Sequence, residues 1–307
     1  MTTASKRLPT ISEPTRSGAT APTRLARSPL ELCTGADLFH DYVLGAYEPL
    51  APAEGKLRSV NLLVESFAHA GVEARGLEVI RRIREGYGPF RTVYGIKWNQ
   101  RTAAMSWELY FYDFHRAHVD CSIAHLREIL APEIVVDAEE PWTLPWHMFS
   151  IEVTREQLES GVAAPPVPVH VYIDMRSYAL TGKSFTFENV YTFHNPRTQV
   201  DEILHRLRSS IHFEPNQHNL AALMPPPLFR CGRICVANKQ SSDAIYFSRV
   251  PSAPLRGFLV RHAWPEPLRA LAASEGFDHL LWDVGTDFRS ASGGAPEIHK
   301  TGVYGTF

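Results

Sequence analysis

Polar and aromatic side chains recur at every second position in several segments that are predicted to be strands. In residues 168–176 they are His170, Tyr172, Asp174 and Arg176, which alternate with Val169, Val171, Ile173 and Met175. Successive side chains of a strand point to opposite faces, so one face of this strand is expected to be apolar and the other polar. Other predicted strands carry comparable sets: Arg91, Gly95 and Lys97; Glu108, Tyr110 and Tyr112; Arg233 and Lys239; Tyr246; and Lys300, Gly302 and Tyr304.

These polar faces suggest a binding chemistry if the sheet closes. In a closed sheet with helices outside, they would converge in a lumen lined by Lys, Arg and Tyr. Basic groups and phenol hydroxyls bind phosphate oxygens, and aromatic rings attract a cation. Such a lumen suits an anionic ligand with an apolar or aromatic body. If the sheet is open, the same faces meet water, as one face of an antiparallel sheet often does.

Helical and strand patterns alternate along most of the chain. Apolar spacing and capping residues predict helices over 36–45, 58–86, 122–130, 154–160, 198–212 and 254–275, the last broken at Pro265 and Pro267. Runs of aromatic and β-branched residues predict strands over 90–98, 105–114, 168–176, 184–193, 229–239, 243–250, 278–288 and 297–307. These eight strands form four hairpins, and a helix precedes each hairpin.

This order predicts an α+β fold. We expect an antiparallel sheet or closed β-barrel built from repeated helix–strand–strand units, with the helices on the outer face. One domain is expected over residues 30–307, after a disordered tail, residues 1–29, which is rich in Thr, Ser, Pro and Arg. A doubly wound parallel sheet is excluded because it needs one strand per helix. No GxGxxG or P-loop motif is present, so nothing supports a Rossmann or P-loop nucleotide site.

The composition limits the kinds of partner that we expect the protein to bind. The 307 residues include 31 Lys and Arg against 33 Asp and Glu, a net charge of −2, which argues against a dedicated nucleic-acid binder. No apolar run approaches the roughly 20 residues of a membrane span, and no apolar leader follows the N-terminus. We therefore expect a soluble, cytoplasmic protein whose partners are small molecules.

A known family shares this arrangement. Serial helix–strand–strand–helix units over about 300 residues resemble the ABBA-fold aromatic prenyltransferases, whose closed antiparallel barrel holds the active site in its lumen. The nearest local likeness is residues 233–250, RICVANKQSSDAIYFSRV, followed by a helix. A similar strand, polar turn and YF strand occurs in that family, and the tyrosine that faces the pocket there corresponds to Tyr246.

The resemblance implies a function in secondary metabolism. The chain would transfer a prenyl group from an allylic diphosphate to an aromatic or other nucleophilic acceptor, a small molecule or a peptide. The basic residues expected to bind the diphosphate are Lys97, Arg176, Arg233, Lys239 and Lys300. The tyrosines expected to shield the carbocation are Tyr94, Tyr110, Tyr172, Tyr246 and Tyr304.

The chain departs from that family in two places. The family has ten strands, so residues 131–153 would have to supply more extended structure. The strand after the YF hairpin usually carries a basic diphosphate ligand in the family, whereas here it is DHLLWDVGTDF, with Asp283 and Asp287. Paired acids of this kind could hold a Mg²⁺ ion that bridges to a diphosphate.

Two other functions remain open. The same sheet could belong to a non-catalytic ligand- or partner-binding protein, in which case the basic residues should scatter over both faces. A third candidate is a non-haem Fe(II) oxygenase, because His118 and Asp120 have the HxD spacing of two facial iron ligands. His194 or His212 would be the third ligand, and Arg197 or Arg206 would bind an acidic co-substrate. An acidic loop, Asp137, Glu139 and Glu140, is expected to be a solvated surface.

Overall fold

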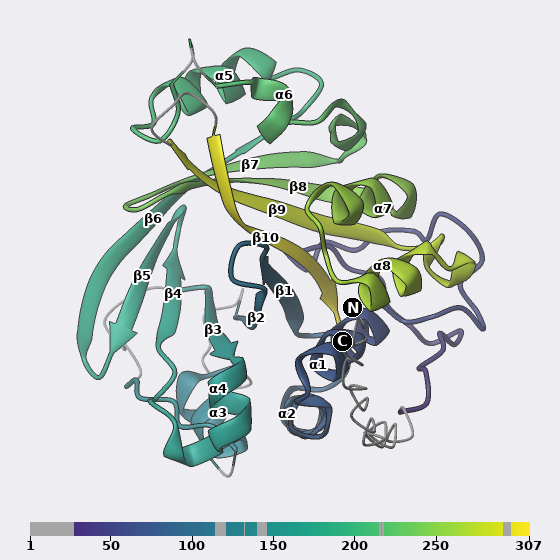
Figure 1. The fold of residues 1–307 in the computed structure, drawn as a ribbon. Helices are drawn as coiled ribbons and strands as arrows, with labels where there is room; N and C mark the ends of the chain where they lie inside the picture. The colour runs from purple at the N-terminus through teal and green to yellow at the C-terminus, as the bar shows by residue number, and fades with distance from the viewer. Residues whose placement is uncertain are drawn as a thin grey trace, which may run out of the picture. The chain divides into compact units, whose positions relative to one another are not determined.

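Ten β-strands form a closed barrel in this computed structural model (Figure 1). The structure describes residues 28–113, 121–131, 133–139, 146–214, 216, 218–290 and 296–307, so most of the predicted tail lies outside the described residues. The strands are β1 (Val93–Asn99), β2 (Ala104–Tyr112), β3 (Met148–Thr154), β4 (Val169–Ile173), β5 (Arg176–Thr181), β6 (Ser184–His194), β7 (Arg233–Lys239), β8 (Asp243–Pro251), β9 (Leu281–Ser290) and β10 (Pro296–Thr306). Each strand pairs antiparallel with the next, and β10 pairs antiparallel with β1, so the closed form of the predicted sheet is confirmed.

Helices precede or separate many of the strands. They are α1 (Val60–Ala70), α2 (Glu73–Tyr87), α3 (Ile123–Leu130), α4 (Arg155–Ser160), α5 (Val200–Arg208), α6 (Leu220–Leu223), α7 (Ser252–Arg261) and α8 (Glu266–Ala273). Short 3₁₀ turns occupy Gly161–Ala163, Pro226–Arg230 and Glu275–Phe277. Across the described ranges, no helix combines the length and the apolar character needed to span a membrane.

Local signals explain several helix boundaries. The predicted helix over 58–86 is divided into α1 and α2 at Gly71, whose φ of 79° is the left-handed conformation that ends a helix. Thr154 and Gln157 form the predicted capping box of α4. The predicted break at Pro265 separates α7 from α8.

The predicted helix over 36–45 is wrong. The segment is a loop in which the Asp41 carboxylate accepts hydrogen bonds from the backbone N–H groups of Val43 and Gly45. Leu44 has a φ of 54°, which a right-handed helix cannot contain. An Asp side chain that accepts hydrogen bonds from nearby backbone N–H groups competes with the hydrogen bonds of a helix. In this segment the side-chain hydrogen bonds form and the helix does not.

The barrel contains two strands more than the eight that the sequence predicts. β3 comes from the segment 131–153, where the family resemblance requires more extended structure. The predicted strand 168–176 is instead a tight hairpin, because Asp174, with a φ of 53°, and Met175 form a turn between β4 and β5. Asp tolerates positive φ better than most residues, so this turn needs no glycine. The barrel therefore has ten strands.

Apolar side chains form two separate clusters. The larger contains helix residues together with strand residues such as Trp107 and Trp282. The indole N–H of Trp107 donates to Ser66 of α1 over 2.7 Å, and that of Trp282 donates to Ser252 of α7 over 3.2 Å. The smaller cluster is lined by tyrosines from several strands and includes Val93 and Met148. The barrel strands thus contribute to two separate apolar clusters, one shared with helices and one made largely of tyrosines.

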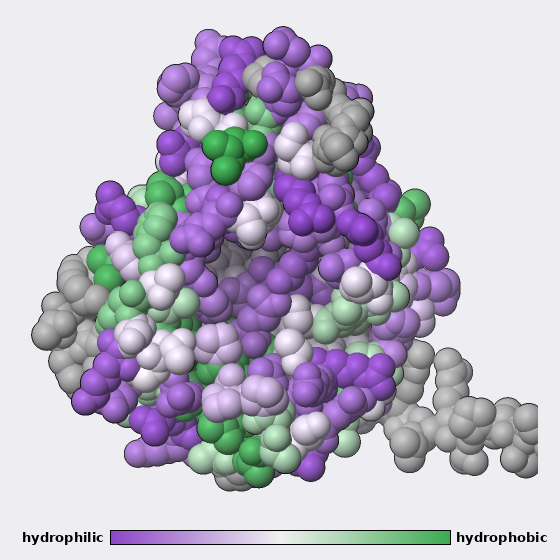
Figure 2. Space-filling view, turned by 60° about the vertical axis from the view of Figure 1, so that its left-hand side comes forward, coloured by the Kyte–Doolittle hydropathy of each residue, from purple (hydrophilic) through white to green (hydrophobic). Residues whose placement is uncertain are grey.

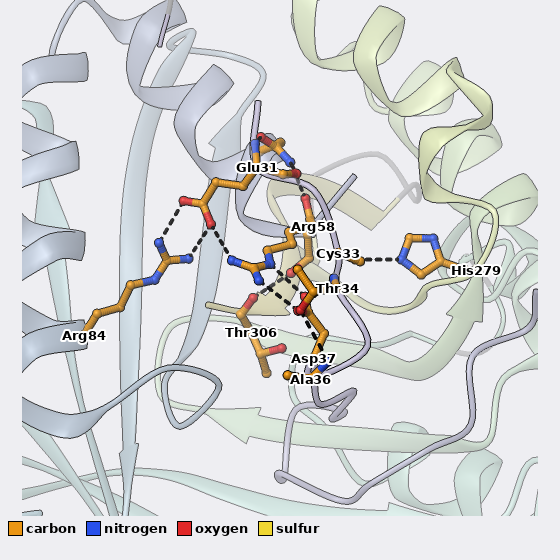
Figure 3. Close-up of polar contacts among 11 residues, drawn as sticks. Glu31, Cys33, Thr34, Ala36, Asp37, Arg58, Arg84, His279 and Thr306 are labelled. Atoms are coloured by element: carbon orange, nitrogen blue, oxygen red, sulfur yellow. Dashed lines mark hydrogen bonds and ion pairs between the residues drawn. The ribbon is translucent and has the colours of Figure 1, made fainter. Parts of the chain in front are cut away.

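An ion-pair network fixes the segment before α1 (Figure 3). The carboxylate of Glu31 accepts hydrogen bonds from Arg58 and Arg84, and Arg58 also donates to both oxygens of Asp37 over 2.7 and 2.8 Å. Arg84 belongs to α2, so the segment is tied to the helices. The chain then continues to Tyr42, whose ring contacts tyrosines in the lumen.

Candidate functional site

A cavity of about 430 Å³ occupies the lumen, and its walls come from nine of the ten strands, the β4–β5 turn and the segment at Tyr42. One face of the molecule is hollowed, and mostly hydrophilic residues surround the hollow (Figure 2). Side chains reach the cavity from alternate positions, as along β2, where Glu108, Tyr110 and Tyr112 all line it. The polar strand faces therefore do converge.

Six tyrosines form a continuous belt across the cavity. In order of ring contact, the tyrosine belt is Tyr191, Tyr172, Tyr110, Tyr42, Tyr304 and Tyr246, with ring centroids 4.9–6.4 Å apart. Burial raises the pKa of each of these phenols, so all six remain neutral at physiological pH. The belt therefore presents aromatic faces and neutral hydroxyl groups to a ligand.

Glycines make room for two of these rings. A Cβ atom on Gly285 would lie 2.4 Å from the ring of Tyr246, and one on Gly95 would lie 2.6 Å from the ring of Tyr304. Both distances are shorter than a Cβ atom can approach another heavy atom, so any larger residue at these positions would displace the ring. The two rings thus lie against bare backbone on neighbouring strands of the wall.

Three lysines form a second group, each with a carboxylate partner. The lysine cluster consists of Lys97 with Glu108 at 2.6 Å, Lys300 with Glu152 at 2.7 Å and Lys239 with Asp287 at 2.8 Å. The pairs are adjacent, since Lys300 lies opposite Asp287 in the β9–β10 register and Glu108 lies opposite Glu152 in the β2–β3 register. The cluster is therefore a network of three positive and three negative groups, buried at Lys97 and Glu108 and half-buried at the other two pairs.

The pKa shifts agree with this charge pattern. Burial opposes a charge on Lys97, but the carboxylate of Glu108 outweighs it, and the pKa of Lys97 is raised. Burial likewise opposes ionisation of Glu152, but Lys300 and Lys97 outweigh it and lower its pKa to about 2. Lys97 is thus an ammonium ion, and Glu152 is a carboxylate.

The lysine cluster touches the tyrosine belt directly. The ammonium of Lys97 lies 5.3 Å from the ring centroid of Tyr304, and that of Lys239 lies 5.8 Å from the ring centroid of Tyr246. Lys239 also donates to the hydroxyl of Tyr246 over 3.3 Å. A ligand in the cavity can therefore meet ammonium groups and aromatic faces at the same time.

Two further titratable groups line the cavity. Nδ1 of His170 lies 2.8 Å from the carboxylate of Glu188; burial opposes protonation of His170, but Glu188 outweighs it and raises the pKa. Asp283 is 4% exposed, and one of its oxygens accepts the backbone N–H of Tyr42 over 2.9 Å. Burial, with a smaller contribution from the charge of Asp41, raises the pKa of Asp283 to about 7.

Most residues predicted for the site line the cavity. They are Tyr110, Tyr172, Tyr246, Tyr304, Lys97, Arg233, Lys239, Lys300, Asp283 and Asp287. Arg233 does not join the lysine cluster; its guanidinium lies 5.8 Å from the ring centroid of Phe193.

Tyr94 and Arg176 do not line the cavity. The hydroxyl of Tyr94 donates to the carbonyl of Ser59 over 2.7 Å, beside the start of α1. Three positions separate Tyr94 from Lys97, so alternation along β1 places them on opposite faces. Arg176 is exposed and follows the β4–β5 turn, which interrupts the alternation predicted for a single strand.

Asp283 and Asp287 do not fit a shared metal site. They are four residues apart on β9, a separation of about 13 Å along a strand. Asp287 is paired with Lys239, and Asp283 binds the backbone of Tyr42. Among the described residues, no three His, Cys, Asp or Glu side chains are grouped as metal ligands.

The predicted iron ligands His118 and Asp120 lie outside the described residues, as does Glu140 of the acidic loop. His212, one candidate for the third ligand, has its Nε2 atom 3.3 Å from the carbonyl of Gln240. His194, the other candidate, lies in β6 and does not line the cavity.

Some site residues had no sequence prediction. Tyr42 lies in the segment predicted to be a helix, and Glu152 lies in β3, which was not predicted. The alternation in FSIEVT, residues 149–154, was a usable signal for β3, because apolar Phe149, Ile151 and Val153 flank Ser150 and Glu152. No comparable pattern marks Tyr42, since its position depends on tertiary contacts.

No protein-family model matches the chain, and no curated protein matches it significantly.

Proposed function

We propose that the lumen binds an allylic diphosphate and transfers its prenyl group to a nucleophilic acceptor. The observation that carries this proposal is the contact between the lysine cluster and the tyrosine belt inside a closed antiparallel barrel. Ionisation of an allylic diphosphate separates a diphosphate anion from a carbocation. The lumen offers ammonium groups for the anion and aromatic faces for the cation next to each other.

In this proposal the lysines and tyrosines have separate tasks. Lys97, Lys239 and Lys300 stabilise the charge that develops on the departing diphosphate. The rings of Tyr304 and Tyr246, which these lysines contact, shield the allylic cation. The acceptor, an aromatic or other nucleophile, is held in line to capture the cation at C1. The helices are taken to lie on the outer face, as the contacts of Trp107 and Trp282 with α1 and α7 suggest.

The carboxylates limit how a diphosphate can bind. Each lysine of the cluster already has a carboxylate within 2.6–2.8 Å. A diphosphate must therefore displace these carboxylates from the ammonium groups or share the groups with them. Because each lysine–carboxylate pair has no net charge, the cluster also favours a second candidate function. In that case the protein is not catalytic and binds a polar ligand that carries both hydrogen-bond donors and acceptors.

The test is release of diphosphate from dimethylallyl diphosphate in the presence of a library of aromatic acceptors, with and without Mg²⁺. Lys300→Gln is the informative variant, since Lys300 lines the cavity and is partly exposed, so the fold should tolerate the change. We expect it to slow release by about tenfold or more, the loss typical of one charge-stabilising group. Lys183→Gln is the control, because the Lys183 side chain is 80% exposed. Absence of release with every acceptor would leave the binding-protein candidate ahead.

A further inference from the structure

We propose that His170, oriented by Glu188, is the general base of the lumen and takes the proton from the nucleophilic atom of the acceptor. The inference rests on the proposed function, because the base acts on the acceptor of that prenyl transfer. It restricts the acceptors to molecules whose reacting atom is the oxygen of an O–H group or the nitrogen of an N–H group. Three features support it: a bulge at Glu188, the hydrogen bond between the two side chains, and the accessible second nitrogen of His170.

A bulge in β6 turns Glu188 into the lumen. In the β5–β6 register, Phe187 and Asn189 pair with consecutive residues of β5, so Glu188 between them is the extra residue. Glu188 and Asn189 both line the cavity, although successive residues of a regular strand point to opposite faces. A bulge re-aims a side chain, and bulges are common next to active sites. Regular pairing is thus interrupted at the residue whose carboxylate meets His170.

A hydrogen bond fixes the orientation of the imidazole ring. Nδ1 of His170, on β4, lies 2.8 Å from a carboxylate oxygen of Glu188. The residue opposite His170 on the intervening strand β5 is Ala179, whose small side chain leaves room for the two groups to meet. A carboxylate accepts hydrogen bonds, so Nδ1 carries the proton. In the neutral ring, Nε2 therefore holds the free lone pair.

Nε2 of His170 is open to the lumen. The side chain of His170 lines the cavity and is 21% exposed. Within the described ranges Nε2 makes no hydrogen bond, yet it is not enclosed by protein, whereas both ring nitrogens of His194 are enclosed. A lone pair in this position can take a proton from an acceptor bound in the cavity.

Carboxylates on three strands surround His170. Besides Glu188 on β6, Glu108 on β2 and Glu152 on β3 favour its protonated form, and each of these two is also paired with a lysine of the cluster. The residues opposite His170 in register on β3 and β5 are uncharged, and Tyr172 on its own strand is a neutral phenol. Burial opposes protonation, but the carboxylates outweigh it and raise the pKa of His170. The imidazolium that forms on proton uptake is therefore stabilised.

The transfer step balances with His170 as proton acceptor. A lone pair of the acceptor oxygen or nitrogen forms the bond to C1 of the prenyl group, while the C1–O bond breaks and its electron pair leaves with the diphosphate. The proton on the acceptor atom moves to Nε2, and the electrons of that O–H or N–H bond stay on the acceptor atom. His170 then gives the proton to solvent.

The first measurement is the imidazole NMR spectrum of the whole ¹⁵N-labelled protein from about pH 5 to 9, with His170→Gln used to assign the signal. We expect the Nδ1–H tautomer and a titration midpoint above the ordinary value of 6.5. Glu188→Gln should lower that midpoint, because it removes the carboxylate that favours the imidazolium. The control is His205→Gln, an exposed histidine of α5, which should leave the midpoint unchanged. A midpoint that Glu188→Gln does not lower overturns the inference.

The second measurement is the formation of prenylated product from dimethylallyl diphosphate and the acceptor of the library that reacts fastest. His170→Gln should slow it by about 100-fold or more, the usual contribution of a general base, and His205→Gln should leave it unchanged. The wild-type rate should rise with pH as His170 loses its proton, and Glu188→Gln should move that rise to lower pH. A merely structural role of Glu188 would not move it.

Two results of the second measurement would overturn the inference while the proposed prenyl transfer stands. One is product formation in His170→Gln within about threefold of the wild type, well short of the loss of a general base. The other is an equal rate with a derivative of the acceptor that is methylated on the reacting atom and so has no proton there. Absence of diphosphate release with every acceptor would instead overturn the proposed transfer, whatever the NMR spectrum shows.

Discussion

Replacing Asp283 by asparagine should stabilise the protein at neutral pH and leave its stability almost unchanged near pH 4. Burial raises the pKa of this carboxyl group from its ordinary value of 3.8 to about 7. A difference of about three pKa units corresponds to roughly 4 kcal/mol between the two protonation states, at about 1.4 kcal/mol per unit. Asparagine does not titrate, so the variant avoids this cost.

The sign follows from proton binding. Between pH 4 and 7 the folded protein keeps the proton on Asp283, whereas the unfolded chain has lost it. The free energy of unfolding therefore falls as pH rises through this window, by at most about 1.4 kcal/mol per pH unit. The stability gap between Asp283→Asn and the wild type should grow across the same window and then level off above pH 7, apart from a constant offset.

Chemical denaturation of both proteins at half-unit steps from pH 4 to 8.5 measures this gap. Asp287→Asn is the matched control on the same strand, because Lys239 and Lys97 outweigh the effect of burial and lower the pKa of Asp287. That carboxylate stabilises the folded state above its unfolded pKa, and this contribution is lost as pH falls toward the folded value. The loss in the free energy of unfolding caused by Asp287→Asn should therefore become smaller as the pH falls. A gap for Asp283→Asn that is flat or shrinks between pH 4 and 7 would refute our account of its burial.

Three other substitutions have expected outcomes in denaturant unfolding. Lys97→Met should lose about 3–5 kcal/mol because it leaves the buried carboxylate of Glu108 unpaired, and adding Glu108→Leu should restore part of that loss; additive losses would contradict the pairing. Gly285→Ala should lose about 1–3 kcal/mol, because its Cβ would lie 2.4 Å from the ring of Tyr246, and a neutral result would show that the ring is free to move. Gly257→Ala, in α7 with no neighbouring atom within 4 Å, should gain about 0.5–1 kcal/mol; a loss would mean that this position is not open.

Regular patterns made much of the barrel predictable. Strand alternation depends only on backbone geometry, so it placed Lys97, Lys239, Lys300 and Tyr304 on the lumen side of their strands before any contact was known. The capping box at Thr154 was equally local, since both of its partners lie within one helical turn. Features that depend on a few neighbouring residues were therefore accessible from the sequence.

Features set by distant residues were not predictable in the same way. Tyr42 lies in a loop held by contacts with Asp283, 241 positions along the chain, and no local spacing encodes that contact. The pairing of lysines with carboxylates also escaped prediction, because Glu152 and Lys300 come from strands far apart in the sequence. Alternation showed which residues face the lumen, but not that the basic groups there are already neutralised.

Closure of the barrel by β1 and β10 affects how the chain folds. Val93 pairs with Thr306, so the seam joins segments separated by most of the described chain. Forming such a contact carries a large entropy cost of loop closure, and it slows folding relative to pairings between neighbouring strands. Until this seam forms, β1 and β10 each present an unpaired strand edge to which another chain can pair, so closure of the barrel protects the protein from edge-to-edge aggregation.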